Sequence, residues 1–286
     1  MFRAVLQRIL TDTRIGPFMK STFQYSISLV VLLCLASYGH SAEVIKVMSY
    51  NIHIATPPSK PDFSHKDLPA IADVINREKP SLVALQEVDK YTERSGKSSD
   101  QAKDLAELTG MHYHFAAASQ KSDGEQGQAI LSKYPIIEAE SYKLPVPESS
   151  DGETRSLAVV VVDVEGVKVA FMSVHLDHRS NADRKFQIEQ MLEHTKKFEE
   201  YPIVFGGDFN MKSDNENFSL VKTQFAMVTD HHPLTFPQIN PRVAIDFILL
   251  NKRGVELFDV ERYYTVDEQY ASDHLPLVIE LKLKEK

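Results

Sequence analysis

LAVVVVDV-EG-VKVAFMSV, residues 157–174, is the stretch of sequence that decides the fold. Its two halves, residues 157–164 and 167–174, are rich in β-branched and apolar residues and have the length of typical strands. The two residues between them, Glu165-Gly166, favour a tight turn. This stretch therefore predicts a long β-hairpin.

Helical periodicity begins soon after this hairpin. The segment from Asn181 to Phe198 is expected to be the longest helix, and its expected apolar side consists of Phe186, Ile188, Met191, Leu192 and Thr195. Shorter helices are predicted at 67–79, before Pro80, and from Asp100 to Gly110. Further strands are predicted at 44–52, 82–85, 112–118, 128–131, 136–143, 203–205, 245–250, 255–260 and 277–281. Strand pairs followed by helices, occurring twice, predict an α/β fold of two packed, mainly antiparallel sheets flanked by helices in one domain.

The composition limits the class of protein. The chain has 286 residues, with 32 Lys and Arg against 40 Asp and Glu, a single Cys and no Trp. These values exclude collagen-like and low-complexity chains, and one Cys excludes an internal disulfide framework and a cysteine-based zinc site. The formal net charge of −8 means that a nucleic-acid binder would have to gather its basic residues on one face.

The N-terminal segment has the features of a secretory signal peptide. The apolar run ISLVVLLCL at 27–35 follows Met19-Lys20 and precedes a small and polar stretch. We expect residues 1–42 to be a signal peptide with an upstream extension, 43–286 to be one catalytic domain, and the protein to be periplasmic or extracellular. An uncleaved N-terminal membrane anchor is the alternative. Without residues 1–42 the chain has 28 basic and 39 acidic residues, a net charge of −11 and no Cys.

Polar side chains interrupt the ends of the predicted strands at six places. A buried carboxylate or imidazole is costly unless it is paired or holds a metal, so six such interruptions indicate one shared site. Each has a simpler explanation by itself: a capped turn, a solvated strand end or a hydrogen-bonded structural histidine. The six are Asn51, Gln86-Glu87, His175, Gly206-Gly207-Asp208-Phe209-Asn210, Asp246 and Ser272-Asp273-His274.

In this order the motifs resemble those of the endonuclease/exonuclease/phosphatase family of metal-dependent phosphoesterases, in particular its compact exported bacterial members. The resemblance runs from about Ile45 to Leu281 and implies a four-layer α/β sandwich. The motifs that carry it are Tyr50-Asn51-Ile52, Leu85-Gln86-Glu87, Ala129-Ile130-Leu131-Ser132, Val174-His175-Leu176, Gly207-Asp208-Phe209-Asn210, Ile245-Asp246-Phe247-Ile248 and Ser272-Asp273-His274.

The resemblance also implies a metal site. Asn51, Glu87 and Asp273 would present oxygen ligands to Mg²⁺ or Mn²⁺. Carboxylate and amide oxygens suit these hard ions. The metal would polarise a phosphoryl oxygen and neutralise charge on the leaving group.

The remaining implied roles concern the water and the phosphate. Asp208 would orient or deprotonate the attacking water, and His274, steered by Asp246, would stabilise the phosphoryl oxygens or assist proton transfer. The phosphate-binding residues implied are Arg155, His175 and Asn210.

The motifs specify the reaction better than the substrate. A nuclease needs a basic face, whereas no run of Lys and Arg here exceeds two residues, so we expect a small or lipid-linked phosphodiester or phosphomonoester. A secreted or periplasmic nuclease is the alternative, with nucleic acid as its partner, and a catalytically inactive binding protein of the same fold is a third hypothesis. We expect a monomer without a stable membrane span after signal cleavage.

Overall fold

The computed structural model describes residues 44–60, 63, 65–121 and 123–284. The expected signal peptide at 1–42 lies outside these residues. No helix among the residues described has the length and apolar character that crossing a membrane requires.

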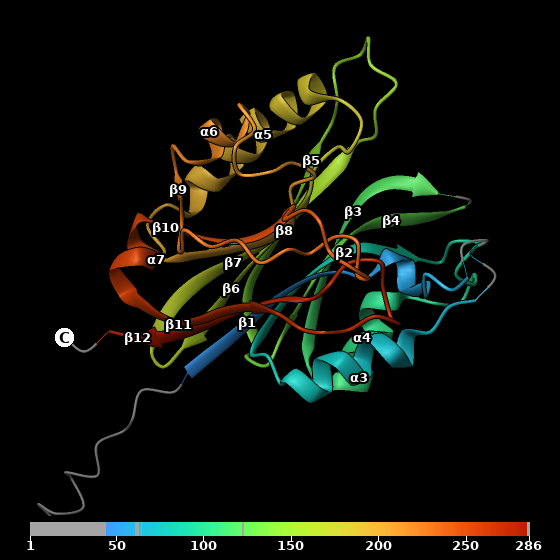
Figure 1. Ribbon diagram of the computed structural model, residues 1–286, viewed down its shortest axis with the longest axis horizontal. Helices are drawn as coiled ribbons and strands as arrows, with labels where there is room; N and C mark the ends of the chain where they lie inside the picture. The colour runs from blue at the N-terminus through green and yellow to red at the C-terminus, as the bar shows by residue number, and fades with distance from the viewer. Residues whose placement is uncertain (1–43, 61–62, 64, 122, 285–286) are drawn as a thin grey trace, which may run out of the picture. The chain divides into compact units, whose positions relative to one another are not determined.

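Two sheets of six strands each form the centre of the fold (Figure 1). The first has the order β11-β12-β1-β2-β4-β3, and the second has the order β5-β6-β7-β8-β10-β9. Neighbouring strands are antiparallel except for the pairs β1/β2 and β7/β8. The strands of the first sheet are β1 (Val44–Asn51), β2 (Leu82–Lys90), β3 (His112–Lys121), β4 (Gly124–Ser132), β11 (Phe258–Thr265) and β12 (Leu277–Leu283). Those of the second are β5 (Ile136–Leu144), β6 (Arg155–Val164), β7 (Val167–His175), β8 (Ile203–Asp208), β9 (Phe225–Met227) and β10 (Asp246–Asn251).

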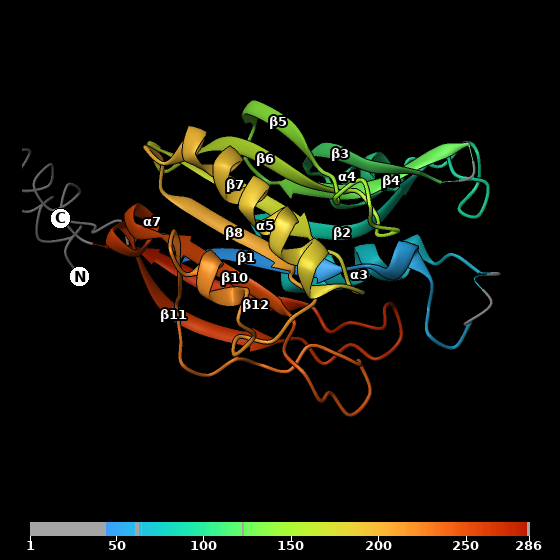
Figure 2. The ribbon, with the colours of Figure 1, turned by 90° about the horizontal axis from the view of Figure 1, so that it is seen from above.

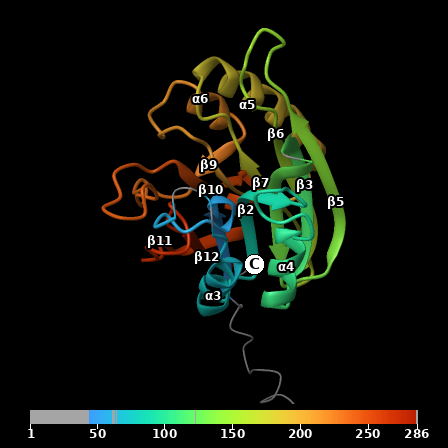
Figure 3. The same ribbon diagram turned by 90° about the vertical axis from the view of Figure 1, so that its right-hand side faces the viewer.

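Helices cover the outer faces of both sheets, which gives four layers. Figure 3 shows α5 and α6 on one side and α3 and α4 on the other, with the two sheets between them. Figure 2 shows α5 lying along the face of β7 and β8. The helices are α3 (Leu68–Glu78), α4 (Gln101–Thr109), α5 (Asn181–Thr195), α6 (Phe218–Val221) and α7 (Lys252–Leu257), with short 3₁₀ turns η1 (His53–Ala55) and η2 (Lys196–Phe198).

Three apolar clusters hold these layers together. One lies between the sheets and includes Val160 and Ile279. A second joins the outer face of the second sheet to α5 through Ile188 and Met191, and a third joins the first sheet to α3 and α4. The fold class expected from the sequence is confirmed, because the two sheets pack against each other and helices pack on their outer faces.

Most of the expected elements are present, and their caps explain where they begin. Asp67 caps α3 by accepting from Ala70 N, and Asp100 caps α4 by accepting from Lys103 N. Gly110 ends α4 in a left-handed conformation. The hairpin of β6 and β7 lies inside the second sheet, with Val160 opposite Phe171.

Three expectations about the elements are wrong. The strand expected at 255–260 is the helix α7 followed by β11, because Asn251 caps a helical turn by accepting from Gly254 N at 2.8 Å. The second strand does not end at Leu85 but continues to Lys90 through an irregular pairing between Leu85 and Val88. Phe186, assigned to the apolar side of the long helix, is 39% exposed.

Candidate active site

The polar residues singled out from the sequence gather at one end of the two sheets. The parallel pairs bring the carboxyl ends of β1 and β2 together in one sheet and those of β7 and β8 together in the other. The antiparallel neighbours β10 and β12 enter at the same end, so Asp246 pairs with Asp208 in register and His274 lies just before β12. Segments far apart in the sequence thus meet there, as the resemblance requires.

Gly206 explains how closely the two sheets approach beneath this site. A Cβ atom at Gly206 would lie 2.9 Å from Ala84 Cβ and 3.3 Å from Ser49 Cβ, both in the opposite sheet. Any larger side chain would push the sheets apart. Two residues later, Asp208 Oδ2 accepts a hydrogen bond from Asn51 Nδ2 at 3.1 Å, which bridges the sheets. The glycine that the sequence indicated only as a turn residue is therefore a packing residue inside β8.

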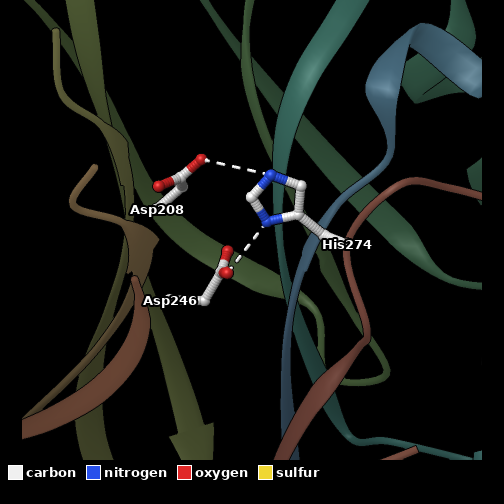
Figure 4. A group of neighbouring side chains, drawn as sticks. All are labelled: Asp208, Asp246 and His274. Carbon is white, nitrogen blue, oxygen red and sulfur yellow. Dashed lines mark hydrogen bonds and ion pairs between the residues drawn. The ribbon is translucent and has the colours of Figure 1, made fainter. Parts of the chain in front are cut away.

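Asp208, Asp246 and His274 form a buried trio (Figure 4). His274 Nδ1 lies 2.9 Å from Asp246 Oδ2, and its other ring nitrogen lies 3.8 Å from Asp208 Oδ2. Phe236 packs against the imidazole with ring centroids 4.9 Å apart. The hydroxyl of Thr235 accepts from Asp246 N at 3.4 Å, and Leu275 N donates to Thr235 O at 2.8 Å. The loop that contains Thr235 and Phe236 therefore holds both Asp246 and His274 in place.

The charges of the trio depend on one another. Burial raises the pKa of Asp208, and Asp246 raises it further, to about 7, although His274 and two hydrogen bonds act in the opposite direction. Burial would lower the pKa of His274, but the carboxylates of Asp246 and Asp208 outweigh it and raise the pKa to about 10. At neutral pH the trio thus combines an imidazolium with a carboxyl group that gives up and takes up a proton.

Asn51, Glu87 and Asp273 lie beside the trio, and Asn51 Oδ1 accepts a hydrogen bond from His53 N at 3.0 Å. Asn51 Nδ2 is 3.3 Å from Glu87 Oε1, and Ser272 Oγ donates to Asn51 O at 2.7 Å, which places Asp273 next to Asn51. Asp273 Oδ1 is buried and has no hydrogen-bond partner among the described residues. A buried carboxylate oxygen without a donor is costly unless a cation completes its surroundings.

Two groups of side chains are thus arranged so that they could hold a divalent ion. The acidic oxygens and imidazole nitrogens of the trio lie within 4.8 Å of one another. However, an imidazolium repels a cation, and Asp246 Oδ2 is engaged by His274. The oxygen-only set of Asn51, Glu87 and Asp273 fits Mg²⁺ or Mn²⁺ better, because these ions prefer carboxylate and amide oxygens.

His175 lies between two hydrogen-bond donors and the carboxylate of Asp208. Arg155 Nη1 is 3.3 Å from its Nδ1, Asn210 Nδ2 is 2.8 Å from its Nε2, and Asp208 Oδ2 is 3.5 Å from the same Nε2. An imidazolium would place donors against both donors, and burial together with Arg155 holds the pKa of His175 well below its usual value. His175 is therefore a neutral residue between Arg155 and Asn210, and all three sequence-predicted phosphate-binding side chains lie in one cluster.

Backbone strain occurs at the same place. Glu87 and Asn210 have φ values of 55° and 50°, and the turn that follows Asn51 has three successive residues in the left-handed region, His53, Ile54 and Ala55. Such conformations cost about 1–3 kcal/mol each and persist only where the surroundings enforce them. Gln101 Nε2 donates to Ile54 O at 3.0 Å, and Asp67 N donates to Ala55 O at 2.8 Å. The strain thus orients the side chains at the ends of β1, β2 and β8.

The structure adds residues that the sequence reasoning missed. His53 Nδ1 lies 3.9 Å from Asp273 Oδ1 and 3.0 Å from Thr56 O. His178 Nδ1 lies 3.2 Å from Arg155 Nη2. Both histidines directly follow a motif, within Asn51-Ile52-His53 and His175-Leu176-Asp177-His178. This position beside a motif was the feature of the sequence that could have identified the two histidines as site residues.

Comparison with known proteins agrees with this arrangement. The model of the endonuclease/exonuclease/phosphatase family matches residues 48–274, so the chain belongs to this family. Members of the family are generally hydrolases that act on phosphoester bonds. The chain is accordingly assigned to the phosphoesterases and nucleases as a class.

The individual relatives have low sequence identity to this chain. The uncharacterized protein YbhP of Escherichia coli K12 is 27% identical over 259 residues, which cover 83% of this chain and 96% of that protein. A mannosyl-6-phosphatase of Bacteroides thetaiotaomicron has 20% identity and a TM-score of 0.66, covering 83% of this chain and 99% of its own. The catalytic domain of human Nocturnin has 18% identity and a TM-score of 0.65, and the match covers 84% of this chain and 94% of that chain. At these identities, the two solved structures show a shared fold.

Proposed function

We propose that the protein is an exported phosphoesterase that requires Mg²⁺ or Mn²⁺ and acts on a small or lipid-linked phosphodiester or phosphomonoester. One observation carries the proposal. The buried trio and the oxygen-only set lie side by side, joined by the hydrogen bond from Asn51 to Asp208. This places a proton acceptor next to oxygens that suit a divalent cation.

The chain's own residues supply most of the chemistry. Asp208, whose pKa is raised to about 7, takes the proton from the attacking water. His274, kept protonated by Asp246, faces the negative charge that develops on the phosphoryl oxygens. Arg155 and Asn210 hold the phosphate. Asn51, Glu87 and Asp273 would hold a divalent ion, and that ion would supply positive charge to polarise the phosphoryl group and to neutralise the leaving group.

Charge supports the preference for a small or lipid-linked substrate. Without its first 42 residues the chain has a net charge of −11. A nuclease has to neutralise several consecutive phosphates, and this makes its affinity depend steeply on salt. The neighbouring fold of a mannosyl-6-phosphatase agrees with a small phosphoester substrate.

The test is a substrate panel with the purified protein, comparing plasmid DNA, RNA, inositol phosphates, a sugar phosphate, sphingomyelin and a glycosylphosphatidylinositol lipid. We expect hydrolysis of a small or lipid-linked phosphoester in Mg²⁺ or Mn²⁺, and its loss in chelator. Turnover that persists in chelator would contradict the metal requirement. Efficient, steeply salt-dependent plasmid cleavage would instead identify a nuclease.

A further inference from the structure

His53 lies between two of the three side chains that would hold the divalent ion. Its backbone N–H donates to Asn51 Oδ1 at 3.0 Å. Its ring nitrogen Nδ1 lies 3.9 Å from Asp273 Oδ1. One residue outside the oxygen-only set is thus in direct contact with two of its members, and these two members come from opposite ends of the chain.

The contact with Asn51 sets the orientation of its side-chain amide. Asn51 Nδ2 lies 3.3 Å from Glu87 Oε1 and 3.1 Å from Asp208 Oδ2, and both of these atoms are hydrogen-bond acceptors. The amide oxygen accepts from His53 N on its other side. A carbonyl oxygen has two lone pairs, so Asn51 Oδ1 keeps one for a cation after it has accepted this hydrogen bond. The N–H of His53 therefore prevents the amide from turning and leaves its oxygen available to an ion.

The imidazole of His53 acts on the second ligand. Its Nδ1 lies 3.0 Å from Thr56 O, which can only accept, so Nδ1 carries the hydrogen. The same nitrogen lies 3.9 Å from Asp273 Oδ1, a buried oxygen without a hydrogen-bond partner among the described residues. This distance is about 0.7 Å longer than an ordinary N–H···O hydrogen bond. The ring N–H is therefore close enough to stabilise the charge of Asp273 and to restrict the rotation of its carboxylate.

The ring also holds the strained turn that carries the backbone N–H. His53 has a φ of 47° and is the first of three successive residues in the left-handed region. Histidine adopts this region more readily than most residues other than glycine, but the conformation still has to be enforced. The imidazole contacts Thr56 O on one side, and Phe63 packs against it with ring centroids 5.3 Å apart. These contacts stabilise the turn in which the N–H of His53 reaches Asn51.

We propose that His53 is a positioning residue for the divalent ion, which orients Asn51 through its backbone N–H and Asp273 through its imidazole N–H. This inference rests on the proposed function and adds to it a residue that determines the affinity for the metal. Contacts of this kind, made to the ligands and not to the ion, change metal affinity by about 10–100-fold.

The test measures Mn²⁺ binding to the full chain without substrate, by calorimetry and by the electron paramagnetic resonance signal of the free ion. His53→Ala removes the ring and should raise the Kd for Mn²⁺ at least about tenfold. The metal concentration for half-maximal hydrolysis should rise by the same factor, and the rate should be largely recovered at saturating Mn²⁺. A residue that acts on the reacting atoms would instead lower kcat at every metal concentration.

Two further variants separate the N–H from the shape of the ring. The amide nitrogen of His53→Asn would lie close to the position of Nδ1, and asparagine tolerates a positive φ, so its Kd should stay within about threefold of the wild type. His53→Phe can keep the packing against Phe63 but has no N–H, and it should bind Mn²⁺ as weakly as His53→Ala.

The matched control is His112→Ala, which should leave the Kd unchanged. His112 is exposed and pairs with Ser132, which in turn lies opposite Leu82 at the start of β2. The control histidine is therefore at the end of the first sheet that is remote from the site.

An unchanged Kd in His53→Ala, or a Kd in His53→Asn as high as in His53→Ala, would overturn the inference. If His53→Ala has a lower melting temperature in chelator, the comparison of His53→Asn with His53→Phe decides the same question. A wild type that binds no Mn²⁺ would overturn the metal requirement and the role of His53 together. Unchanged binding in His53→Ala with weakened binding in Glu87→Gln would overturn only the role of His53.

Discussion

The two sides of the site differ in the source of the positive charge that balances their carboxylates. On one side, Asp208, Asp246 and His274 are buried and compensate one another's charges. On the other, Glu87 and Asp273 are partly exposed, and a buried oxygen of Asp273 has no hydrogen-bond partner among the described residues and lies 3.9 Å from His53 Nδ1. The protein supplies the positive charge itself on the first side, whereas the proposed divalent cation would supply it on the second.

This difference predicts how each side responds to its surroundings. The charges of the trio should change with pH, because its residues gain and lose protons. The charge of the oxygen-only set should instead be balanced by a bound divalent ion, so this side should respond to the metal concentration. Three substitutions test this division, and they are described from the largest expected effect to the smallest.

Asp208→Asn should cause the largest loss. It removes the proton acceptor while keeping nearly the same shape, so kcat on a phosphoester in saturating Mg²⁺ should fall by about 10³-fold. Asp214→Asn, an exposed acid on the loop that follows, is the control and should stay near the wild-type rate. A loss smaller than about tenfold would show that another group accepts the proton.

Asp208 should also make stability depend on pH. Because its pKa is raised in the folded protein, the folded state binds the proton more tightly, and the free energy of unfolding falls as pH rises from about 4 through 7. Urea unfolding in chelator measures this slope, which Asp208→Asn should flatten. An equally steep slope in the variant would assign it to other groups.

Asp246→Asn should act on His274. The raised pKa of His274 contributes stability that is fully present below about pH 6.5 and is lost as pH rises through about 10. Removing the carboxylate should cost about 3 kcal/mol at pH 7, move the alkaline limb of the rate profile to lower pH and lower kcat by about 10²-fold. Urea unfolding and rates at pH 6–10 measure these effects.

The surface variant Asp259→Asn is the control for this substitution, because its carboxylate lies 3.7 Å from Lys284 and its side chain is 62% exposed. It should change neither the stability nor the rate profile. An unchanged pH profile in Asp246→Asn would mean that Asp246 does not set the protonation of His274.

Glu87→Gln should have the smallest effect on the maximal rate and act on the metal. Replacing one ligand oxygen should raise the Mg²⁺ concentration for half-maximal activity about tenfold. Thermal stabilisation by Mg²⁺ should weaken in parallel. Glu107→Gln, an exposed acid on α4, provides the control, and equal metal dependence in both variants would place the ion elsewhere.

The elements of the fold were predictable where local signals agreed. The capping carboxylates Asp67 and Asp100 and the apolar runs of β6 and β7 each specify their structure within a few residues. The segment 255–260 was misassigned because its β-branched residues favour a strand, while the cap at Asn251 starts a helical turn first. Phe186 has helical spacing but lies at the edge of the covered face.

The sequence predicted which residues belong to the candidate site, but it did not predict how their side chains are arranged. The motif order identified Asn51, Glu87, Asp208 and His274, and the structure brings them to one end of the sheets. It did not identify His53 or His178, because their contacts with Asp273 and Arg155 join segments that meet only in the folded chain.

By itself, the sequence determined the family, the layered α/β class and the residue types available for phosphoester chemistry, because these follow from apolar periodicity and from motifs that are local. Only the tertiary structure decided which charged side chains lie close enough to act on one another. Proton affinities and unpartnered oxygens depend on distances of a few ångströms between segments that are up to 221 residues apart, such as Asn51 and Ser272.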